Sequence, residues 1–158
     1  MATDWDPEDI EKAAYHEAGH AIVAWSLDLQ VDGVYLDPVG NSGHAMIALA
    51  KDPIQQVTVW YAGFEAEDIF KGPAAFVRAE EDFLWANEEL TKKLREEFGQ
   101  RKMVQSAEGR WFQISCRARA QELLRQHKDR VERVVKELLQ PPHEIKRERF
   151  EQLMQAES

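Results

Sequence analysis

The residues best suited to chemistry form the pentapeptide His16-Glu17-Ala18-Gly19-His20, which has the pattern H-E-x-x-H. Side chains four positions apart in an α-helix lie one turn apart on the same face. The imidazoles of His16 and His20 can therefore bind one metal ion together. Glu17 lies beside them as a general base for water that the metal activates. The pattern predicts a zinc site that hydrolyses peptide bonds.

The motif has this meaning only on a helix, and the residues around it predict one. Asp6 followed by Pro7 is typical of a helix start, with Asp6 as the N-cap and Pro7 at the first helical position. Apolar residues then recur at helical spacing up to Trp25, and residues 27–30 mark the expected end. The alternative interpretation, a chance pattern on a polar face, is not favoured because the neighbouring residues are small and apolar: Ala13, Ala14, Ala18 and Ala21.

Catalytic zinc normally has three protein ligands and leaves a fourth position for water. Two acidic clusters, 65–68 and 80–82, could supply the third ligand, and spacing alone does not choose between them. On the predicted third helix Glu80 and Asp82 flank the apolar stripe, so both could reach inward, whereas Glu81 points away from it. Most of these acids are expected to be ordinary charges on a helix surface.

The other residues with reactive side chains are weaker candidates. His44 lies in a predicted strand, where it could line a cleft, and His127 and His143 lie in charged stretches that are expected to be solvated. Cys116 is the only cysteine, which excludes an internal disulfide and fits a reducing compartment. It has no supporting motif for nucleophilic chemistry.

Length and composition predict one globular domain spanning 1–158. The chain has 44% hydrophobic and 31% charged residues, which is typical of a globular protein with a sizeable core. No apolar run approaches the ~20 residues needed to cross a membrane, and the acidic N-terminus lacks the shape of a signal peptide. We therefore expect a cytoplasmic protein with no membrane anchor of its own.

The net charge of −9 is unevenly distributed along the chain. Residues 1–90 contain 18 acidic and 4 basic residues, whereas residues 91–158 contain 11 acidic and 16 basic residues. The acidic half argues against nucleic-acid binding. In the basic half, acids and bases alternate along helices, which is typical of a solvated face. That half could also dock on the acidic half of the same or a neighbouring chain, so a homo-oligomer stays open.

The remaining patterns predict a mainly α fold of the α+β kind, with a small hairpin or sheet near the metal helix. Strand candidates at 31–36 and 44–49 flank a turn cluster at 37–43. A polar loop is expected at 99–109. Helices are predicted over about 52–71, from 75 or 78 to 98, over 111–126 and over 129–139, followed by a short last helix with Phe150 and Leu153.

Apolar stripes on these helices predict which side chains form the core. The stripe of the third helix contains Ala79, Phe83, Ala86, Leu90 and Leu94, and the later helices include Ile114 among their apolar positions. Four tryptophans fall within or beside apolar stripes, so most of them are expected in the core: Trp5, Trp60, Trp85 and Trp111.

The chain resembles the peptidase domain of the FtsH-type ATP-dependent zinc metalloproteases. Residues 14–23, Ala-Tyr-His-Glu-Ala-Gly-His-Ala-Ile-Val, match the signature helix of that family almost letter for letter. Residues 62–72 align with the family's Gly-Gly-Arg-Ala-Ala-Glu-Glu-Ile-Ile-Phe-Gly, and 34–38 lie where the family has a strand ending in Pro-Arg-Gly. The family's third ligand is an Asp that opens the next helix and is followed by an apolar residue and, three positions later, by Ala; here these residues are Asp82-Phe83-Leu84-Trp85-Ala86. Residues 119–124 resemble the family's late helix more weakly.

The resemblance implies a helical zincin-type peptidase domain in which His16, His20 and Asp82 bind zinc and Glu17 is the general base. For such a peptidase we expect a polypeptide substrate to lie extended along the edge of the strands at 31–49, held by backbone hydrogen bonds. The chain departs from the family in having no ATPase module, no phosphate loop and no membrane anchor, and in replacing Pro-Arg-Gly by Pro38-Val39-Gly40.

We therefore expect an ATP-independent metallopeptidase that acts on unfolded or flexible polypeptides, and a separate ATPase partner stays open. The alternative is a non-catalytic, zinc-stabilised interaction or regulatory module derived from the peptidase fold. Glu17 argues against this alternative, because a structural zinc site needs no general base and is usually closed by four protein ligands.

Overall fold

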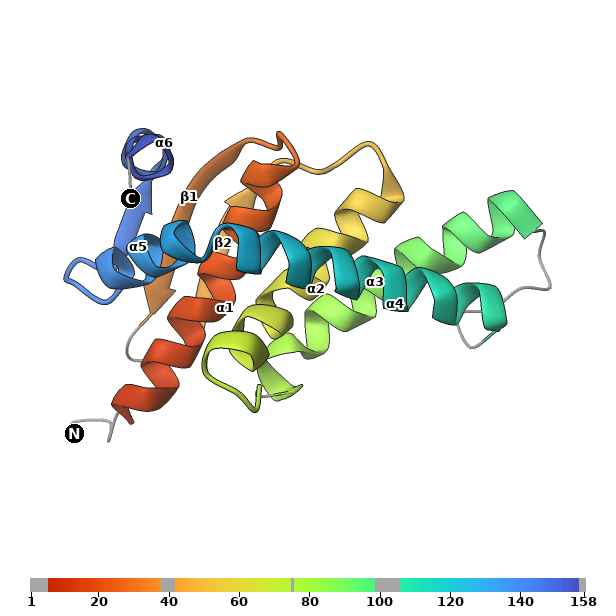
Figure 1. Cartoon of the computed structure of the whole chain (residues 1–158), viewed down its shortest axis with the longest axis horizontal. Coiled ribbons are helices and arrows are strands. Elements are labelled where there is room, and N and C mark those ends of the chain that lie inside the picture. Colours follow the sequence, from red (N-terminus) through yellow and green to blue (C-terminus); the bar gives the residue numbers. More distant parts are fainter. Residues whose placement is uncertain (1–5, 38–41, 75, 99–105, 157–158) are drawn as a thin grey trace.

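The computed structural model describes residues 6–156 except 38–41, 75 and 99–105, and it is mainly helical with one small sheet (Figure 1). The predicted fold class, mainly α with a small β element, is confirmed. The elements, in chain order, are α1 (Pro7–Ser26), β1 (Val31–Asp37), β2 (Ser42–Ile47), α2 (Pro53–Phe70), α3 (Phe76–Phe98), α4 (Ala107–Gln126), α5 (Lys128–Leu138), β3 (Glu144–Lys146) and α6 (Arg147–Gln155).

Helices α1 and α2 begin as their sequences predict. The Asp6 carboxylate accepts a hydrogen bond from the backbone N–H of Glu8 at 3.0 Å, and Pro7 occupies the first helical position. Asp52 caps α2 in the same way, accepting from the N–H of Ile54 at 2.9 Å. Both caps satisfy backbone donors that the first helical turn would otherwise leave unpaired.

Helix α1 lies in the interior of the molecule, in contact with α2, α4, α5, β1 and β2. Every residue from Ala13 to Ala24 except Tyr15 is buried, and this stretch includes the whole H-E-x-x-H motif. The contact with α2 is close because Gly19 has no side chain. A Cβ at that position would lie 2.6 Å from both the Ala62 carbonyl oxygen and the Ala66 Cβ. The H-E-x-x-H motif is therefore fixed against α2.

The sheet is antiparallel with strand order β2-β1-β3, so β2 is an edge strand. The predicted second strand, 44–49, is shifted to Ser42–Ile47, because Ser42 and Gly43 continue the pairing with Asp37 and Leu36. Strand β3 was not predicted. Its three residues are too few to show an alternating pattern, although buried Ile145 pairs with Val34.

The buried apolar residues form two clusters. The larger one joins α1, the sheet, α5 and α6, which lie towards the left of Figure 1, and the smaller one lies among α2, α3 and α4 towards the right. The smaller cluster contains Val57, Tyr61, Ala86, Leu90, Leu94, Phe112 and Cys116. Since α2 contributes to both clusters, it connects α1 to the α3–α4 pair.

The structure corrects two predictions about the second half of the chain. Helix α4 begins at Ala107, within the predicted loop, because the Ser106 hydroxyl accepts a hydrogen bond from the N–H of Gly109 at 3.2 Å. The rest of that predicted loop, 99–105, lies outside the described residues, as does most of the predicted turn at 37–43. The core prediction was wrong for Trp85, Trp111 and Ile114, whose side chains are exposed.

The remaining tryptophan predictions have different outcomes. Trp60 is half-buried against the smaller cluster, and Trp5 lies outside the described residues.

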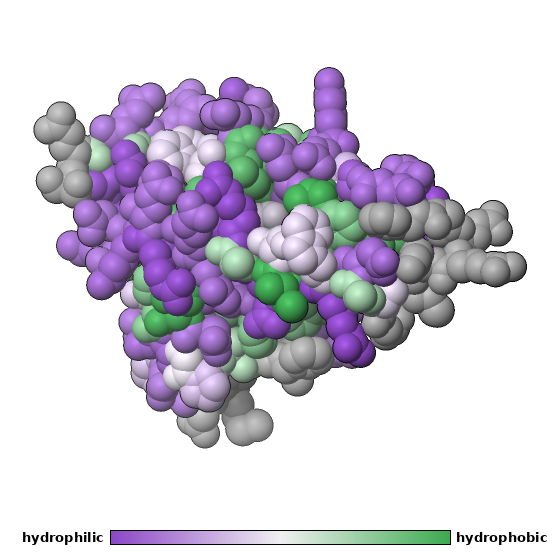
Figure 2. All heavy atoms as spheres, turned by 45° about the vertical axis from the view of Figure 1, so that its right-hand side comes forward, coloured by the Kyte–Doolittle hydropathy of each residue, from purple (hydrophilic) through white to green (hydrophobic). Residues whose placement is uncertain are grey.

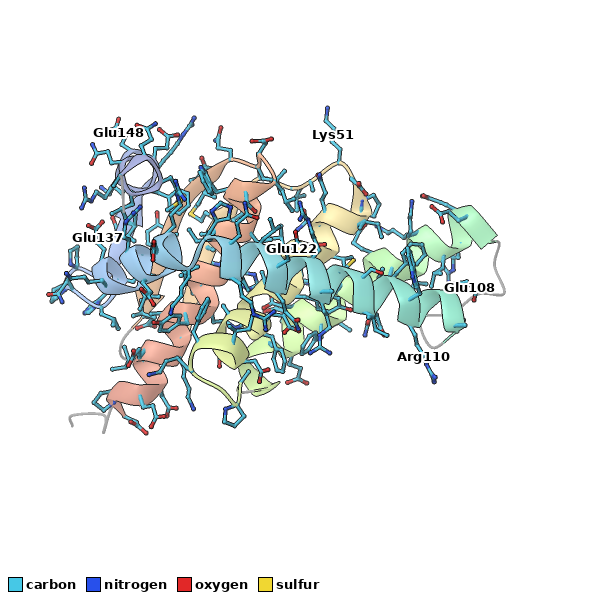
Figure 3. The ribbon with its side chains drawn as sticks, in the orientation of Figure 1. Lys51, Glu108, Arg110, Glu122, Glu137 and Glu148 are labelled. Atoms are coloured by element: carbon cyan, nitrogen blue, oxygen red, sulfur yellow. The ribbon has the colours of Figure 1, made fainter. Side chains whose placement is uncertain are left out.

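On the face shown in Figure 2, hydrophobic atoms appear in small groups among mostly hydrophilic ones. Charged side chains such as Lys51, Arg110 and Glu148 point away from the molecule (Figure 3). Among the described helices, none combines the length and the apolar character that crossing a bilayer requires.

Candidate metal centre

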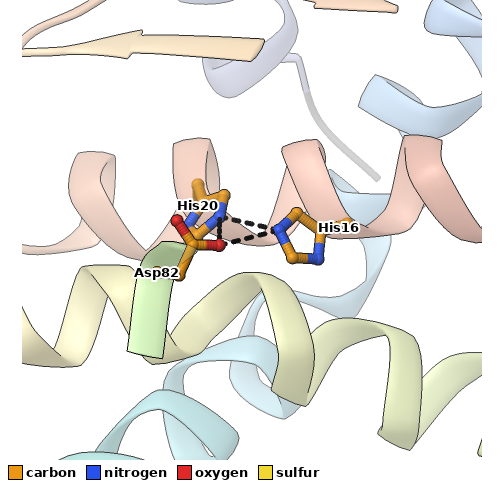
Figure 4. Close-up of side chains that lie close together, drawn as sticks. All are labelled: His16, His20 and Asp82. Atoms are coloured by element: carbon orange, nitrogen blue, oxygen red, sulfur yellow. Dashed lines mark hydrogen bonds and ion pairs between the residues drawn. The ribbon is translucent and has the colours of Figure 1, made fainter. Parts of the chain in front are cut away.

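His16 and His20 of α1 meet Asp82 of α3 at one point in the structure (Figure 4). The Nε2 atoms of the two imidazoles lie 3.1 Å apart, and each lies 3.0 Å from Oδ2 of Asp82. Both histidines are buried, and Asp82 is partly buried. The structure therefore brings together the three residues that the motif and the family resemblance suggest as zinc ligands.

The position of Asp82 depends on the packing of its neighbour Phe83. The Phe83 ring lies 5.6 Å from the Tyr61 ring and 5.1 Å from the Phe64 ring, measured between centroids. These contacts fix α3 on α2, and they leave the preceding side chain, Asp82, directed at α1. The apolar stripe predicted for α3 is buried or half-buried, which holds the helix in this orientation.

The two imidazoles are held by α2 through their other ring nitrogens. Nδ1 of His16 lies 3.0 Å from Oε1 of Glu67, and Nδ1 of His20 lies 2.7 Å from the Val59 carbonyl oxygen. A carbonyl oxygen and a carboxylate only accept hydrogen bonds, so both Nδ1 atoms carry the proton and donate. Such partners fix the ring orientation of metal-binding histidines.

The two acidic clusters at 65–68 and 80–82 have different roles in the structure, although their spacing in the sequence did not distinguish them. Asp82 alone reaches both Nε2 atoms, whereas Glu67 holds the opposite side of His16. Glu65 is buried and accepts hydrogen bonds from Arg117 at 2.5 Å and Gln121 at 2.9 Å on α4. Sequence reasoning named Glu67 only as a member of the 65–68 cluster and missed its role beside His16.

Gly63 of α2 leaves room for the imidazoles. A Cβ at this position would lie 2.5 Å from Nε2 of His20 and 2.6 Å from Nε2 of His16. A side chain would therefore collide with the two nitrogen atoms that face Asp82. The backbone of α2 passes directly beside the cluster, and only glycine permits this approach.

The charges of the cluster reinforce one another. Burial alone would lower the pKa of His16, but its hydrogen bonds to Asp82 and Glu67 raise that pKa from 6.5 to about 9. The pKa of His20 is also raised, since the charge of Asp82 outweighs burial. Burial opposes ionisation of Asp82, yet the adjacent imidazoles hold its pKa well below the ordinary range. The site thus favours positive charge between the imidazoles and the carboxylate.

The donor set fits a divalent cation. Once Nε2 is deprotonated, each imidazole keeps its Nδ1 proton and presents an Nε2 lone pair, and Asp82 presents carboxylate lone pairs to the same point. These acceptors repel one another unless positive charge lies between them. Their separations of 3.0–3.1 Å are close to the edges of about 3.3 Å that a tetrahedral zinc site would have. Within the described ranges, no other group of three such side chains converges in this way.

Glu17 opens onto the same cavity as the three candidate ligands. The cavity has a volume of about 210 Å³, and β2 lies over it, so that a Cβ on Gly43 would be 2.5 Å from Cγ of Glu17. Burial raises the pKa of Glu17, while the neighbouring imidazoles partly oppose that shift. A carboxylate with a raised pKa in a cavity beside a candidate metal site can take up and release a proton.

The other candidates from the sequence lie outside the cluster. His44 lines the same cavity, as expected, but it is exposed and is not among the three converging side chains. Cys116 is buried in the cluster between α2 and α4, where its thiol contacts the Ile54 carbonyl oxygen at 3.7 Å. His127 is partly buried against Trp25, and the His143 ring lies 2.8 Å from the Leu138 carbonyl oxygen.

Comparison of the sequence with protein-family models and with curated proteins found no match. The resemblance to the FtsH-type peptidases therefore depends on the residues quoted above.

Proposed function

We propose that this chain is a zinc-dependent metalloendopeptidase that hydrolyses peptide bonds in unfolded or flexible polypeptides. One observation carries the proposal: the Nε2 atoms of His16 and His20 and Oδ2 of Asp82 converge within 3.1 Å, and Glu17 opens onto the same cavity. The donor set of two imidazoles and one carboxylate leaves a fourth position for solvent or substrate, as in catalytic zinc sites.

When bound, zinc would polarise the scissile carbonyl and lower the pKa of water at the site. The Glu17 carboxylate accepts the proton of the attacking water and later donates it to the leaving nitrogen. Glu67 and the Val59 carbonyl hold the two imidazoles in place throughout, so that their Nε2 atoms stay directed at the centre. Strand β2 and the buried wall around Glu17 limit the access of bulk water.

Strand β2 provides a means of binding an extended peptide. Among the described strands it pairs with β1 alone, so its other edge can offer backbone groups to a peptide. A polypeptide that adds to this edge would be held mainly by backbone hydrogen bonds. Such binding needs an unfolded or flexible segment, and it depends little on side chains.

Replacement of Glu17 by Gln tests the proposal directly. The zinc-loaded protein should cleave casein, whereas Glu17→Gln should lose cleavage by at least a hundredfold and retain about one zinc per chain. The His20→Ala variant should lose both. A zinc-loaded protein that cleaves neither casein nor any member of a peptide library would overturn the peptidase proposal and leave a zinc-stabilised interaction module as the better account.

A further inference from the structure

We propose that Leu49, Trp60 and Trp85 form an apolar subsite of the metal cavity and select a bulky apolar side chain next to the scissile bond. This inference depends on the proposed function and specifies its substrate preference. All three residues line the cavity that also contains His16, His20 and Asp82.

The three side chains come from the elements that build the metal site. Trp85 follows Asp82 by one turn of α3, so the two side chains lie on the same face of that helix. Trp60 follows Val59, whose carbonyl oxygen accepts the hydrogen bond from His20. Leu49 follows the edge strand β2. A side chain in this subsite would therefore lie directly beside the candidate metal.

The subsite exposes apolar surface to solvent. Leu49 is 78% exposed and Trp85 is 40% exposed, and the rings of Trp60 and Trp85 lie 6.1 Å apart at 44°. Large apolar side chains gain stability by burial, and a group of them at the rim of a cavity is typical of a binding surface. A substrate side chain that covers them would recover this stabilisation.

The backbone around Leu49 is held in place even though its side chain is free of the core. The Ala48 N–H donates to the Gln30 carbonyl oxygen at 2.9 Å, and the Ala50 N–H donates to Oε1 of buried Gln56 at 2.7 Å. These hydrogen bonds on both sides fix the direction in which Leu49 projects. A preformed wall costs less ordering on binding than a mobile loop would.

The size and charge of the cavity define the side chain that fits. Its volume of about 210 Å³ is below the roughly 300–1,000 Å³ of pockets that enclose a drug-sized ligand, so it accommodates part of an extended chain. Glu17, Glu81 and Asp82 also line it, and their charges disfavour an acidic side chain. The apolar wall disfavours a small or polar one. Phe, Tyr, Trp, Leu and Met fulfil both conditions.

The test is cleavage of a peptide library by the zinc-loaded protein, with mass spectrometry of the products. We expect bulky apolar residues to be enriched at one fixed position relative to the cut. The Trp85→Ala and Leu49→Ala variants should lower kcat/KM about tenfold or more for a peptide with Phe at that position, and much less for the matched peptide with Ala. Trp111→Ala removes an exposed tryptophan on α4 that does not line the cavity, and it should leave both values unchanged.

A second measurement separates the subsite from catalysis and from folding. In zinc-loaded Glu17→Gln protein, a fluorescently labelled Phe peptide should bind more tightly than its Ala counterpart, and adding Trp85→Ala should remove this difference. Trp85→Phe should retain most of it. Binding with this dependence but without any cleavage by the unmodified protein would overturn the peptidase proposal and not the subsite. Cleavage without positional preference, or enrichment of Arg, Lys or acidic residues, would overturn the subsite and not the peptidase.

Discussion

Nδ1 of His16 on α1 lies 3.0 Å from Oε1 of Glu67 on α2, and both side chains are buried. This hydrogen bond joins the two helices beside the candidate metal centre. It also decides which nitrogen of His16 keeps its proton, because the carboxylate accepts from Nδ1 and leaves Nε2 directed at Asp82. Glu67 is thus expected to affect zinc affinity without binding zinc.

Replacement of Glu67 by Ala should weaken zinc binding about 10- to 100-fold, because it removes the partner that orients His16. Glu67→Gln keeps an acceptor oxygen and should lose less. Asp68→Ala, an exposed change on the next residue, is the matched control and should bind zinc as the unmodified chain does. Competition with a chromophoric chelator gives the three affinities. Equal affinity of a folded Glu67→Ala protein and the unmodified protein would contradict this role.

Replacement of Gly63 by Ala should reduce zinc affinity at least tenfold although it changes no ligand. The added methyl group would lie 2.5–2.6 Å from the Nε2 atoms of both histidines, so the imidazoles must move. Overpacking of this kind typically also costs about 1–3 kcal/mol of stability. Zinc titration and urea unfolding of the metal-free protein measure the two effects separately. Unchanged zinc affinity would show that the imidazoles can shift without losing their common centre.

The affinity for zinc should rise with pH between 6 and 8. The pKa of His16 in the metal-free protein is raised to about 9, so zinc must displace a proton from this ring at neutral pH. Loss of one proton corresponds to an increase of about tenfold per pH unit. Chelator competition at pH 6, 7 and 8 measures the slope. His44→Ala, which changes a cavity residue outside the cluster, should leave the slope unchanged, whereas a flat profile for the unmodified protein would exclude proton competition at His16.

The stability of the metal-free protein should change with pH in the opposite direction. The folded-state pKa of His16, about 9, lies above the unfolded value of 6.5, so the protonated ring favours folding. This contribution is fully present below pH 6.5 and is lost as pH rises from 6.5 through 9. Urea unfolding in the presence of a chelator should show a decrease over this window that His16→Ala lacks.

Zinc should raise the unfolding temperature, and a chelator should reverse the increase. A ligand that binds only the folded state stabilises it by about 4 kcal/mol at a thousand times its Kd. Differential scanning calorimetry with and without zinc measures the shift. The His20→Ala variant, which lacks one candidate ligand, should show no increase. A zinc-dependent shift of the same size in this variant would place the zinc elsewhere.

The parts of the fold that depend on local sequence could be predicted. Capping residues predict the Asp-Pro starts of α1 and α2, and apolar periodicity predicts the buried stripe of α3. Both signals are contained in a short stretch of sequence. The proximity of Asp82 to His16 could not follow from spacing, since the two residues are 66 positions apart and their contact depends on how α3 packs against α2. The pattern left Asp82 as one of several acidic candidates, and only the family resemblance chose it.

The errors at Trp111 and Ile114 have a physical cause. Helix α4 carries two apolar stripes, and only the one through Phe112, Cys116 and Ala120 faces the core. The second stripe, with Trp111 and Ile114, lies on roughly the opposite face of the helix and is exposed. Periodicity identifies both stripes but does not show which of them the neighbouring helices cover.

Helix α2 supplies the Glu67 carboxylate and the Val59 carbonyl, which hold the Nδ1 atoms, and the space at Gly63 beside the Nε2 atoms, so these three constraints on the two imidazoles come from a single helix. Any substitution that shifts α2 against α1 by a fraction of an ångström should therefore alter metal retention, even when it lies among the apolar contacts of α3 and α4. The zinc content of purified variants would then serve as a sensitive gauge of how well that distant packing is preserved.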